Sequence, residues 1–165
     1  MARVRGHPHV IQLLEILVAP ARFFFVLEAA TGRDLFNTVA SKTRLEERVV
    51  RKYFRQLVYG VHHCHCRGVF HRNLKLESIL LDQNGDVKIG GFTAAAHFAV
   101  GRRTRPQLKN ICGTPEYLAP EMLEGQPYDG ISADIWAIGV ILYAMLEGFL
   151  PFKSEYQVEL FAKIK

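Results

Sequence analysis

The sequence has few cysteines and no long hydrophobic run, and both absences limit what the chain can be. Its three cysteines, Cys64, Cys66 and Cys112, provide no paired disulfide framework, so a reduced intracellular compartment is the simpler interpretation. The longest apolar run, Ile135–Leu146, is shorter than the roughly 20 residues that span a bilayer, and the start of the chain lacks the apolar core of a signal peptide. We therefore expect no membrane partner and a location in the cytoplasm or also in the nucleus.

The chain is long enough and apolar enough for one domain with a hydrophobic core. It has 165 residues, of which 49% are hydrophobic, and we find no internal repeat or low-complexity segment. The formal net charge is +5, but the basic residues form no single block. The densest group is Arg102, Arg103, Arg105 and Lys109, which we interpret as a solvated loop. The charge alone therefore gives no reason to expect a nucleic-acid partner.

Short apolar runs predict two pairs of β-strands. Residues 10–18 and 22–27 are apolar and are separated by Ala-Pro-Ala, the pattern of two strands joined by a turn. Residues 79–81 and 87–89 are β-like and flank a polar turn with an Asn-Gly pair, which suits a hairpin. The segment 93–113, with its Gly, Arg and Pro residues, is expected to be a loop.

Helical periodicity predicts the remaining elements. One long helix is expected from Glu46 to about Cys66, where an Arg-Gly pair closes it. Its apolar positions are expected on one face: Val50, Phe54, Leu57, Val58 and Val61. A second strong helix is predicted over 131–146, and shorter helices are predicted near Leu35 and from about residue 155 onward.

Five short segments carry the most specific signal. Residues 71–78 read His-Arg-Asn-Leu-Lys-Leu-Glu-Ser, and Gly-Phe-Thr follows at 91–93. The other three segments are His7–Val10, Cys112–Glu121 and Asp134–Gly139. One such segment would be a weak signal, but all five, in this order and at this spacing, closely resemble the signature motifs of the protein kinase family.

Other residues make the resemblance narrower. Tyr53–Leu57, Cys64–Val69 and Gly139–Leu142 resemble the plant Ser/Thr kinases that interact with calcineurin-B-like calcium sensors. The resemblance implies an α+β protein-kinase-like fold, mostly the helical C-lobe with a two-strand remnant of the N-lobe. Residues 1–30 would be the N-lobe remnant and the hinge, and residues 31–165 would be an incomplete C-lobe.

The resemblance also implies that functional parts of such a kinase are missing from this sequence. We expect the glycine-rich loop, the lysine strand and the partner-glutamate helix to be absent before His7, and the last large-lobe helices and the calcium-sensor-binding segment to be absent after Lys165. Glu121 would then lack the arginine with which the family pairs it. An unpaired buried charge typically costs about 3–5 kcal/mol, so we expect a marginally stable or self-associating chain.

Three catalytic positions depart from the family pattern, while Lys75 of the catalytic loop is retained. Asn73 replaces the Asp that accepts the substrate proton, Ser78 replaces the Asn that holds a second magnesium, and Gly91 replaces the Asp that holds the main magnesium. An amide is no substitute for a carboxylate base, and loss of a general base typically costs about 10²–10⁴ in rate. Glycine offers no side-chain ligand to magnesium, which prefers carboxylates and water.

The resemblance assigns binding roles to a second set of positions. Glu28 to Ala30 would form the hinge, and Leu80 would form the floor beneath adenine. Because the strands that roof this pocket are expected to be missing, we expect poor nucleotide affinity. The peptide-docking surface would comprise Glu77, Gly113, Thr114, Pro115 and Glu116.

Packing roles follow from the resemblance as well. Leu13, His71 and Phe92 would stack on one another, and Asp134 would anchor the backbone of the His71 loop. The His-His-Cys-His-Cys run at 62–66 fits no standard zinc spacing, and adjacent helical residues point in different directions, so we interpret it as a helix end.

Regulation by phosphorylation of the activation loop is expected to be lost or relocated. The position of the usual phosphorylated Thr holds Asn110, and Arg72 would normally meet that phosphate. Thr104 is the only hydroxyl residue between Ala94 and Gly113.

These observations lead to one principal hypothesis and two alternatives. The principal hypothesis is a catalytically inactive, pseudokinase-type interaction module, or the product of a degenerate kinase gene, in calcium or stress signalling. It requires no cofactor and binds protein partners, among them kinase-pathway proteins. The first alternative is an active Ser/Thr kinase that uses ATP and magnesium, if a longer product supplies the N-lobe. The second is a translated fragment without a function.

Overall fold

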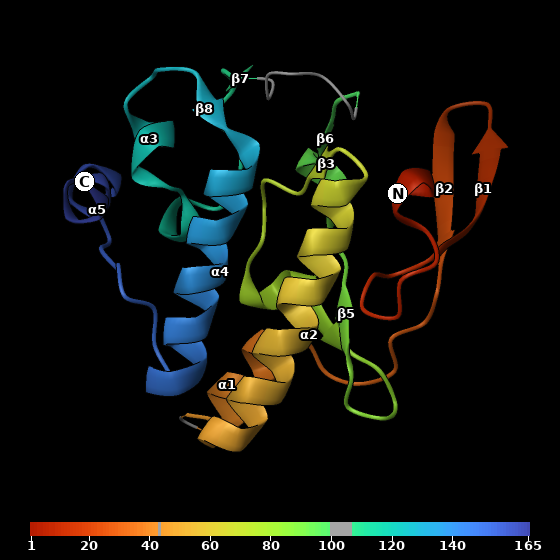
Figure 1. Ribbon diagram of the computed structural model, residues 1–165, viewed down its shortest axis with the longest axis horizontal. Coiled ribbons are helices and arrows are strands. Elements are labelled where there is room, and N and C mark those ends of the chain that lie inside the picture. Colours follow the sequence, from red (N-terminus) through yellow and green to blue (C-terminus); the bar gives the residue numbers. More distant parts are fainter. Residues whose placement is uncertain (43, 100–106) are drawn as a thin grey trace.

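Two long helices form the centre of the fold. The structure is a computed structural model that describes residues 1–42, 44–99 and 107–165. α2 (Glu47–Cys66) and α4 (Gly130–Glu147) lie side by side and run in opposite directions (Figure 1). The other helices are α1 (Leu35–Lys42), α3 (Pro120–Leu123) and α5 (Gln157–Ile164), with 3₁₀ turns η1 (Ala2–Val4), η2 (Leu76–Ser78), η3 (Phe92–Ala94) and η4 (Pro115–Tyr117).

The strands of the described chain form four separate antiparallel pairs. In order of pairing they are β1 (Leu13–Ala19) with β2 (Arg22–Leu27), β3 (Val69–Phe70) with β6 (Ala96–His97), β4 (Ile79–Leu81) with β5 (Val87–Ile89), and β7 (Gln107–Leu108) with β8 (Tyr128–Asp129). The first and third pairs confirm the two hairpins expected from the sequence. β6 and β7 correct the expectation of a loop over 93–113, because their partners, β3 and β8, are remote in sequence and leave no local signal.

Helix α2 is amphipathic, as its sequence predicts. Val50, Leu57 and Val61 are buried on one face, and Phe54 is half-buried beside them. The prediction for Val58 is wrong, because this side chain is 39% exposed. Val58 directly follows Leu57 and is therefore rotated by about 100° away from the buried face.

Helix α4 is apolar on nearly all sides. Asp129 caps its first turn by accepting a hydrogen bond from the amide of Ile131 at 3.1 Å, and Gly148, with φ +84°, ends it. The helix has 18 residues and is longer than the sequence predicts, so by length and composition alone it could cross a membrane. Half of it is buried inside the domain, however, and it packs on α2, as the core helix of a globular domain does.

The main hydrophobic core lies between the two long helices and the β4–β5 hairpin. Its fully buried members include Leu57 of α2, Ile141 of α4, Ile79 of β4 and Ile89 of β5. A glycine sets the closest approach of α2 to β5: a Cβ added at Gly60 would lie 2.5 Å from Cδ1 of Ile89 and 3.0 Å from the carbonyl oxygen of His9.

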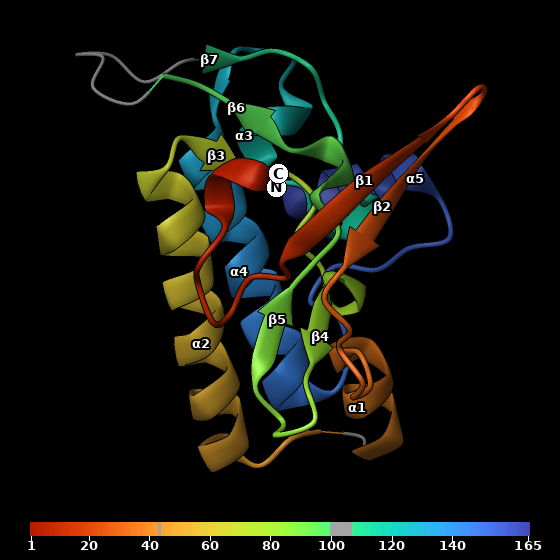
Figure 2. The same cartoon turned by 90° about the vertical axis from the view of Figure 1, so that its right-hand side faces the viewer.

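The β1–β2 hairpin projects away from this core (Figure 2). Its cross-strand pairs include Ile16 with Phe25 and Leu17 with Phe24, and these side chains are exposed on both faces of the hairpin. Large exposed apolar patches favour association with other surfaces. This arrangement supports the expectation of self-association, although for a different reason from the unpaired Glu121.

Two glycines test the packing of the long helices. We expect Gly60→Ala to lower the free energy of unfolding by about 1–3 kcal/mol, because overpacking at Ile89 and His9 outweighs the better helix propensity of alanine. Gly139 of α4 is the matched control, since no atom lies within 4 Å of a Cβ placed there. Gly139→Ala should raise the free energy of unfolding by roughly 0.5–1 kcal/mol. Urea unfolding measures both, and a stabilising Gly60→Ala would contradict the packing described here.

Candidate functional site

A buried carboxylate on α4 holds the loop that follows β3. One carboxylate oxygen of Asp134 accepts the amide hydrogen of Arg72 at 2.7 Å, and the other accepts that of His71 at 2.9 Å. The second oxygen also lies 2.8 Å from Nε2 of His65 on α2. Asp134 is 1% exposed, so two amides and an imidazole take the place of water around its charge. This confirms the expected anchor.

His71 links this loop to the segment at 90–92. Its ring is buried and lies 4.6 Å, centroid to centroid, from the ring of Phe92. Burial lowers the pKa of His71 below its usual value, so the ring is neutral. Because Nδ1 accepts the amide hydrogen of Asn73 at 3.3 Å, Nε2 carries the proton and donates to the carbonyl of Gly90 at 2.7 Å. The rings of His71 and Phe92 are thus in contact, as expected, but tilted by 55° rather than stacked. Leu13 is buried at the start of β1, and its place in the expected stack stays a prediction.

Arg72 has a backbone conformation that residues other than glycine rarely adopt. Its φ is +63°, and its side-chain Nε donates to the carbonyl of Ala94 at 2.7 Å. The carbonyl of Arg72 lies so close to Gly113 that a Cβ there would be 2.8 Å away, and Gly113 itself has φ +116°. Only glycine fits this contact, which brings the segment at 113–117 against the His71 loop.

Asn73 and Thr114 meet across that contact. The hydroxyl of Thr114 donates to the side-chain oxygen of Asn73 at 3.1 Å, and both residues are half-buried. A second contact joins the same segments, because the hydroxyl oxygen of Tyr117 accepts the amide hydrogen of Leu76 at 3.4 Å. Burial raises the pKa of Tyr117 well above its usual value, so this phenol stays protonated. Sequence analysis did not single out Tyr117, although it lies within one of the five segments.

The hydroxyl of Ser78 is occupied by its own turn. It donates to the carbonyl of Lys75 at 2.8 Å and accepts the amide hydrogen of Lys75 at 3.0 Å. The carbonyl of Ser78 accepts the amide hydrogen of Gly90 at 2.9 Å. Gly91 follows with φ +76°, and a Cβ added there would lie 3.1 Å from Cβ of Ser78.

The structure therefore brings the three substituted positions together around one imidazole. Asn73 and Gly90 bind the two nitrogens of His71, and Ser78 binds Gly90, the neighbour of Gly91. Together the three positions offer an amide, a hydroxyl already used twice and a glycine, and none of them supplies a carboxylate. Such a set does not fit magnesium, which takes carboxylate and water oxygens.

Two of the three adenine-pocket positions lie near each other, because Glu28 pairs with Lys88, the cross-strand partner of Leu80. The role of all three in binding adenine stays a prediction. Leu80 lines an open hollow of about 580 Å³ next to Asp34, whereas Glu28 and Ala30 do not line it. Glu28 instead forms an ion pair with Lys88 of β5 and accepts the amide hydrogen of Gln12 at 3.1 Å. Sequence analysis did not single out Lys88. The only signal for it was a lysine between two buried residues of a strand.

The docking positions lie on and beside η4. Gly113, Thr114, Pro115 and Glu116 follow one another there, and Glu77 is exposed on η2. This places all five on two segments that the Tyr117 and Thr114 hydrogen bonds tie together.

Glu121 is half-buried, and no ion pair or hydrogen bond to its side chain is seen within the described ranges. The expectation of a buried unpaired charge is therefore met only in part: the carboxylate has no partner among the described residues, but it is half-buried and water still reaches it. Asn110 is exposed, and Thr104, Arg102, Arg103 and Arg105 lie outside the described residues, so the expectations for them remain untested.

The histidine and cysteine run at the end of α2 points in several directions. His62 lies 3.3 Å from the sulfur of Cys66, His63 binds the carbonyl of Val4 at 3.2 Å, and Cys64 is buried. In the parts of the chain that the structure describes, no group of three or more His, Cys, Asp or Glu side chains is placed to hold a metal ion.

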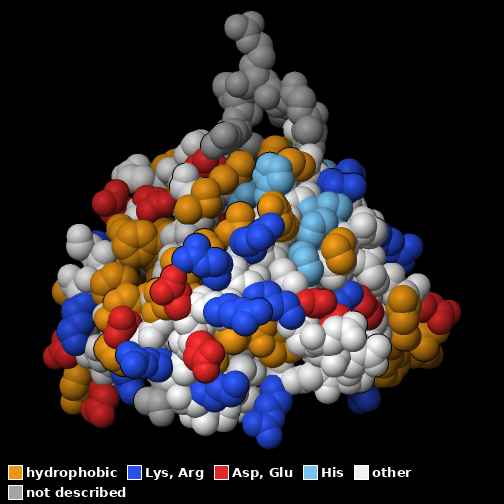
Figure 3. All heavy atoms as spheres, turned by 60° about the horizontal axis from the view of Figure 1, so that its bottom comes forward, with side chains coloured by type: hydrophobic (Ala, Val, Ile, Leu, Met, Phe, Trp, Pro, Cys, Tyr) orange, Lys and Arg blue, Asp and Glu red, His pale blue; other side chains and the backbone are white. Residues whose placement is uncertain are grey.

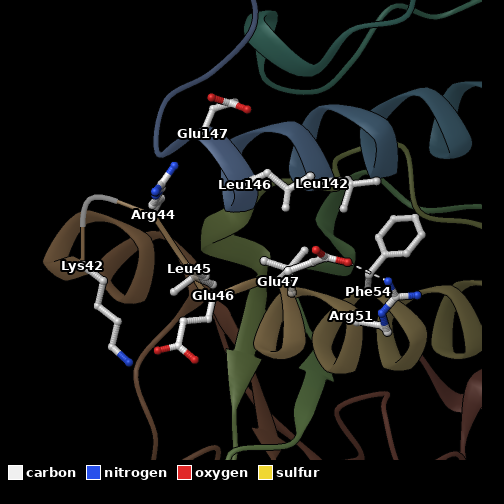
Figure 4. Close-up of a pocket in the computed structure, with 11 residues that line it drawn as sticks. Lys42, Arg44, Leu45, Glu46, Glu47, Arg51, Phe54, Leu142, Leu146 and Glu147 are labelled. Atoms are coloured by element: carbon white, nitrogen blue, oxygen red, sulfur yellow. Dashed lines mark hydrogen bonds and ion pairs between the residues drawn. The ribbon is translucent and has the colours of Figure 1, made fainter.

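A hollow of about 900 Å³ lies away from these motifs, between the end of α1, the start of α2 and the end of α4 (Figure 4). Its wall is apolar, with Phe54, Leu142 and Leu146, and its rim carries both signs of charge, including Arg44 and Glu147. No residue of the catalytic or docking set lines it, so it is not part of the candidate site.

Comparisons with known proteins agree with this arrangement. The family model described as "Protein kinase domain" matches residues 1–165. CBL-interacting serine/threonine-protein kinase 24 of Arabidopsis thaliana is 49% identical over 162 residues, which cover 98% of this chain and 36% of that protein. CBL-interacting protein kinase 31 of Oryza sativa subsp. japonica is 48% identical over 158 residues, which cover 96% of this chain and 35% of that protein. The chain thus spans about a third of the length of these relatives.

The Asp134 anchor gives the first prediction for this site. We expect Asp134→Ala to lower the free energy of unfolding by about 2–6 kcal/mol, because it leaves one buried and one half-buried amide unpaired at about 1–3 kcal/mol each. The exposed Glu124 provides the control, and Glu124→Ala should change stability by no more than about 0.5 kcal/mol. Urea unfolding compares the two variants, and equal small effects would show that Asp134 is not the anchor.

Stability is also expected to fall in mild acid. Burial lowers the pKa of His71, and burial and then neighbouring cationic groups lower the pKa of His7 and His63. Below the unfolded-state pKa of about 6.5, the unfolded chain therefore binds protons that the folded chain does not. The free energy of unfolding should be greatest above about pH 6.5 and fall as the pH drops towards 5. Urea unfolding across this range tests the prediction. His63→Gln should make the free energy of unfolding depend less on pH. A parent chain whose free energy of unfolding stays constant across this range would contradict the prediction.

Proposed function

The chain belongs to the protein kinase family, and we propose that it is a protein-interaction module of that family that does not transfer phosphate. One observation carries the proposal. Asn73, Ser78 and Gly91 occupy one place in the fold, and together they provide neither a base nor a carboxylate for magnesium.

The chemistry of phosphoryl transfer explains why these losses matter. The reaction depends on positioning and on neutralising the charge of the transferred phosphate, and magnesium supplies much of that neutralisation. Metal stabilisation is worth several kcal/mol, and about 1.4 kcal/mol corresponds to a tenfold change in rate. Loss of the base costs a further factor of about 10²–10⁴.

The segment to which the resemblance assigns peptide docking keeps the residues of the kinase pattern, whereas three catalytic positions do not. Thr114 binds Asn73, Gly113 packs on Arg72, and Tyr117 closes the segment against η2. Their ordered geometry supports a role for the segment at 113–117 in binding a protein partner. The kinship with CBL-interacting kinases supports a place in calcium or stress signalling, and we propose the cytoplasm as the location.

The competing function is an active Ser/Thr kinase that works as part of a longer product. The observation that favours it is the framework: Asp134 anchors the loop, and the ring of His71 contacts that of Phe92. In this function Lys75 would serve the transfer of phosphate, and Glu28, Ala30 and Leu80 would border the nucleotide. The three substituted positions weigh against it.

Nucleotide binding separates the two functions. We expect no change in the melting temperature of the chain when ATP and magnesium are titrated together, because Gly91 and Ser78 leave the metal without ligands. A ligand that binds the folded state raises the melting temperature in a saturable way. A saturating rise would therefore overturn the proposal.

Phosphate incorporation into a basic peptide completes the test. The chain and Asn73→Asp should both give the same background as Lys75→Ala, since the substitution returns the base but not the metal ligand. Incorporation by Asn73→Asp above that background would show that the base alone was missing.

A further inference from the structure

The outward face of α2 carries a row of cations. Arg51 and Lys52 lie three and four residues after Arg48, and Arg55 lies four and three residues after them, so the four cations share one side of the helix. All four are exposed, and the buried apolar residues of α2 lie on the opposite side. Figure 3 shows Lys and Arg side chains across the middle of the face in view, with Asp and Glu side chains among them and histidines nearby. We name these four residues the basic face.

Acidic neighbours neutralise only part of the basic face. Arg51 pairs with Glu47 at 2.7 Å, and Lys52 pairs with Asp86 at 2.9 Å. Both pairs are at the surface, where an ion pair is weak and can be exchanged for another partner. Arg48 and Arg55 form no ion pair with any residue that the structure describes; Arg55 instead lies 5.9 Å above the ring of Tyr59.

The basic face borders a trough rather than a flat surface. A hollow of about 450 Å³ is lined by all four cations together with His9 and Tyr59. A second hollow of about 450 Å³ also contains His9 and Tyr59, and it continues past His62 and His63 to Arg67. The two hollows share His9 and Tyr59 and follow one another along α2 from Arg48 to Arg67, and we name them together the trough. At about 1.5 Å per helical residue, the trough is about 28 Å long, the span of eight or nine extended residues.

We propose that this trough binds an extended, acidic polypeptide segment of a partner protein. The proposal names the class of partner for the interaction function given above and rests on that function. Guanidinium groups are suited to this task because each can hold a carboxylate with two parallel hydrogen bonds. The trough is as wide as one helix face, and its length also fits a single extended polypeptide chain.

Two other polyanions fit the trough less well. Single-stranded nucleic acids bind through a series of aromatic rings on which bases stack, but Tyr59 is the only aromatic ring in the trough besides the histidines, and Arg55 covers it. A membrane surface is bound by helices that combine a basic face with large apolar side chains. Among the described residues of α2, Val58 and Tyr59 are the only large hydrophobic ones that are exposed.

Fluorescence anisotropy with defined probes tests the proposal. The probe is a labelled peptide of eight glutamates, and the competing probes are eight-residue oligolysine, an eight-nucleotide oligothymidylate and phosphatidylserine vesicles. We expect saturable binding of the acidic peptide that weakens with salt, no binding of oligolysine, and weaker binding of the other two. Tighter binding of the nucleotide or of the vesicles would overturn the proposal.

Two double variants distinguish binding at the trough from a general effect of net charge. Arg48→Glu with Arg55→Glu should weaken peptide binding about tenfold or more. Arg22→Glu with Arg33→Glu changes the net charge equally at exposed positions outside the trough and should leave binding almost unchanged. Equal loss in both pairs, or no binding by the parent chain, would refute the trough, and matching circular dichroism melts verify that each variant is folded. The ATP titration does not depend on this result, so either proposal can fail alone.

Discussion

The hydrogen bonds of one buried carboxylate organise the candidate site. Asp134 comes from the central helix α4, and its two oxygens fix consecutive amides of the loop that carries His71 and Asn73. Because an unpaired charge in the interior would be very costly, the carboxylate and the loop must stay together. His71 then extends the network to Gly90, and Gly113 packs on Arg72. Three segments remote in sequence from α4 are therefore linked to a single side chain.

The framework and the chemistry of the site have separate physical requirements. His71, Phe92 and Asp134 act through packing and hydrogen bonds inside the protein, and their contacts are complete. Asn73 and Gly91 are the positions to which the kinase resemblance assigns the base and a metal ligand, and among the described residues no contact requires a carboxylate at either position. An ordered loop is thus compatible with Asn at position 73 and Gly at position 91, and the proposed function draws on this separation of framework and chemistry.

Two exposed surfaces of this chain are suited to contacts with other molecules. The β1–β2 hairpin exposes apolar side chains on both faces, and α2 exposes a row of cations opposite its buried face. The two surfaces differ in chemistry, since apolar area favours association without direction whereas charge selects for partners of opposite sign. Both features agree with a chain that works in contact with other polypeptides.

The sequence by itself determined what depends on local pattern and on spacing along the chain. Hydrophobic periodicity located the β1–β2 and β4–β5 hairpins and the helices α2 and α4, and the five motif segments identified the family and the substitutions at Asn73 and Gly91. Only the tertiary structure decided which distant groups meet. The ion pair of Glu28 with Lys88, the strands β6 and β7, and the solvent access of Glu121 depend on contacts between remote segments. Local sequence patterns do not predict such contacts, because these depend on the packing of segments that are remote in the sequence.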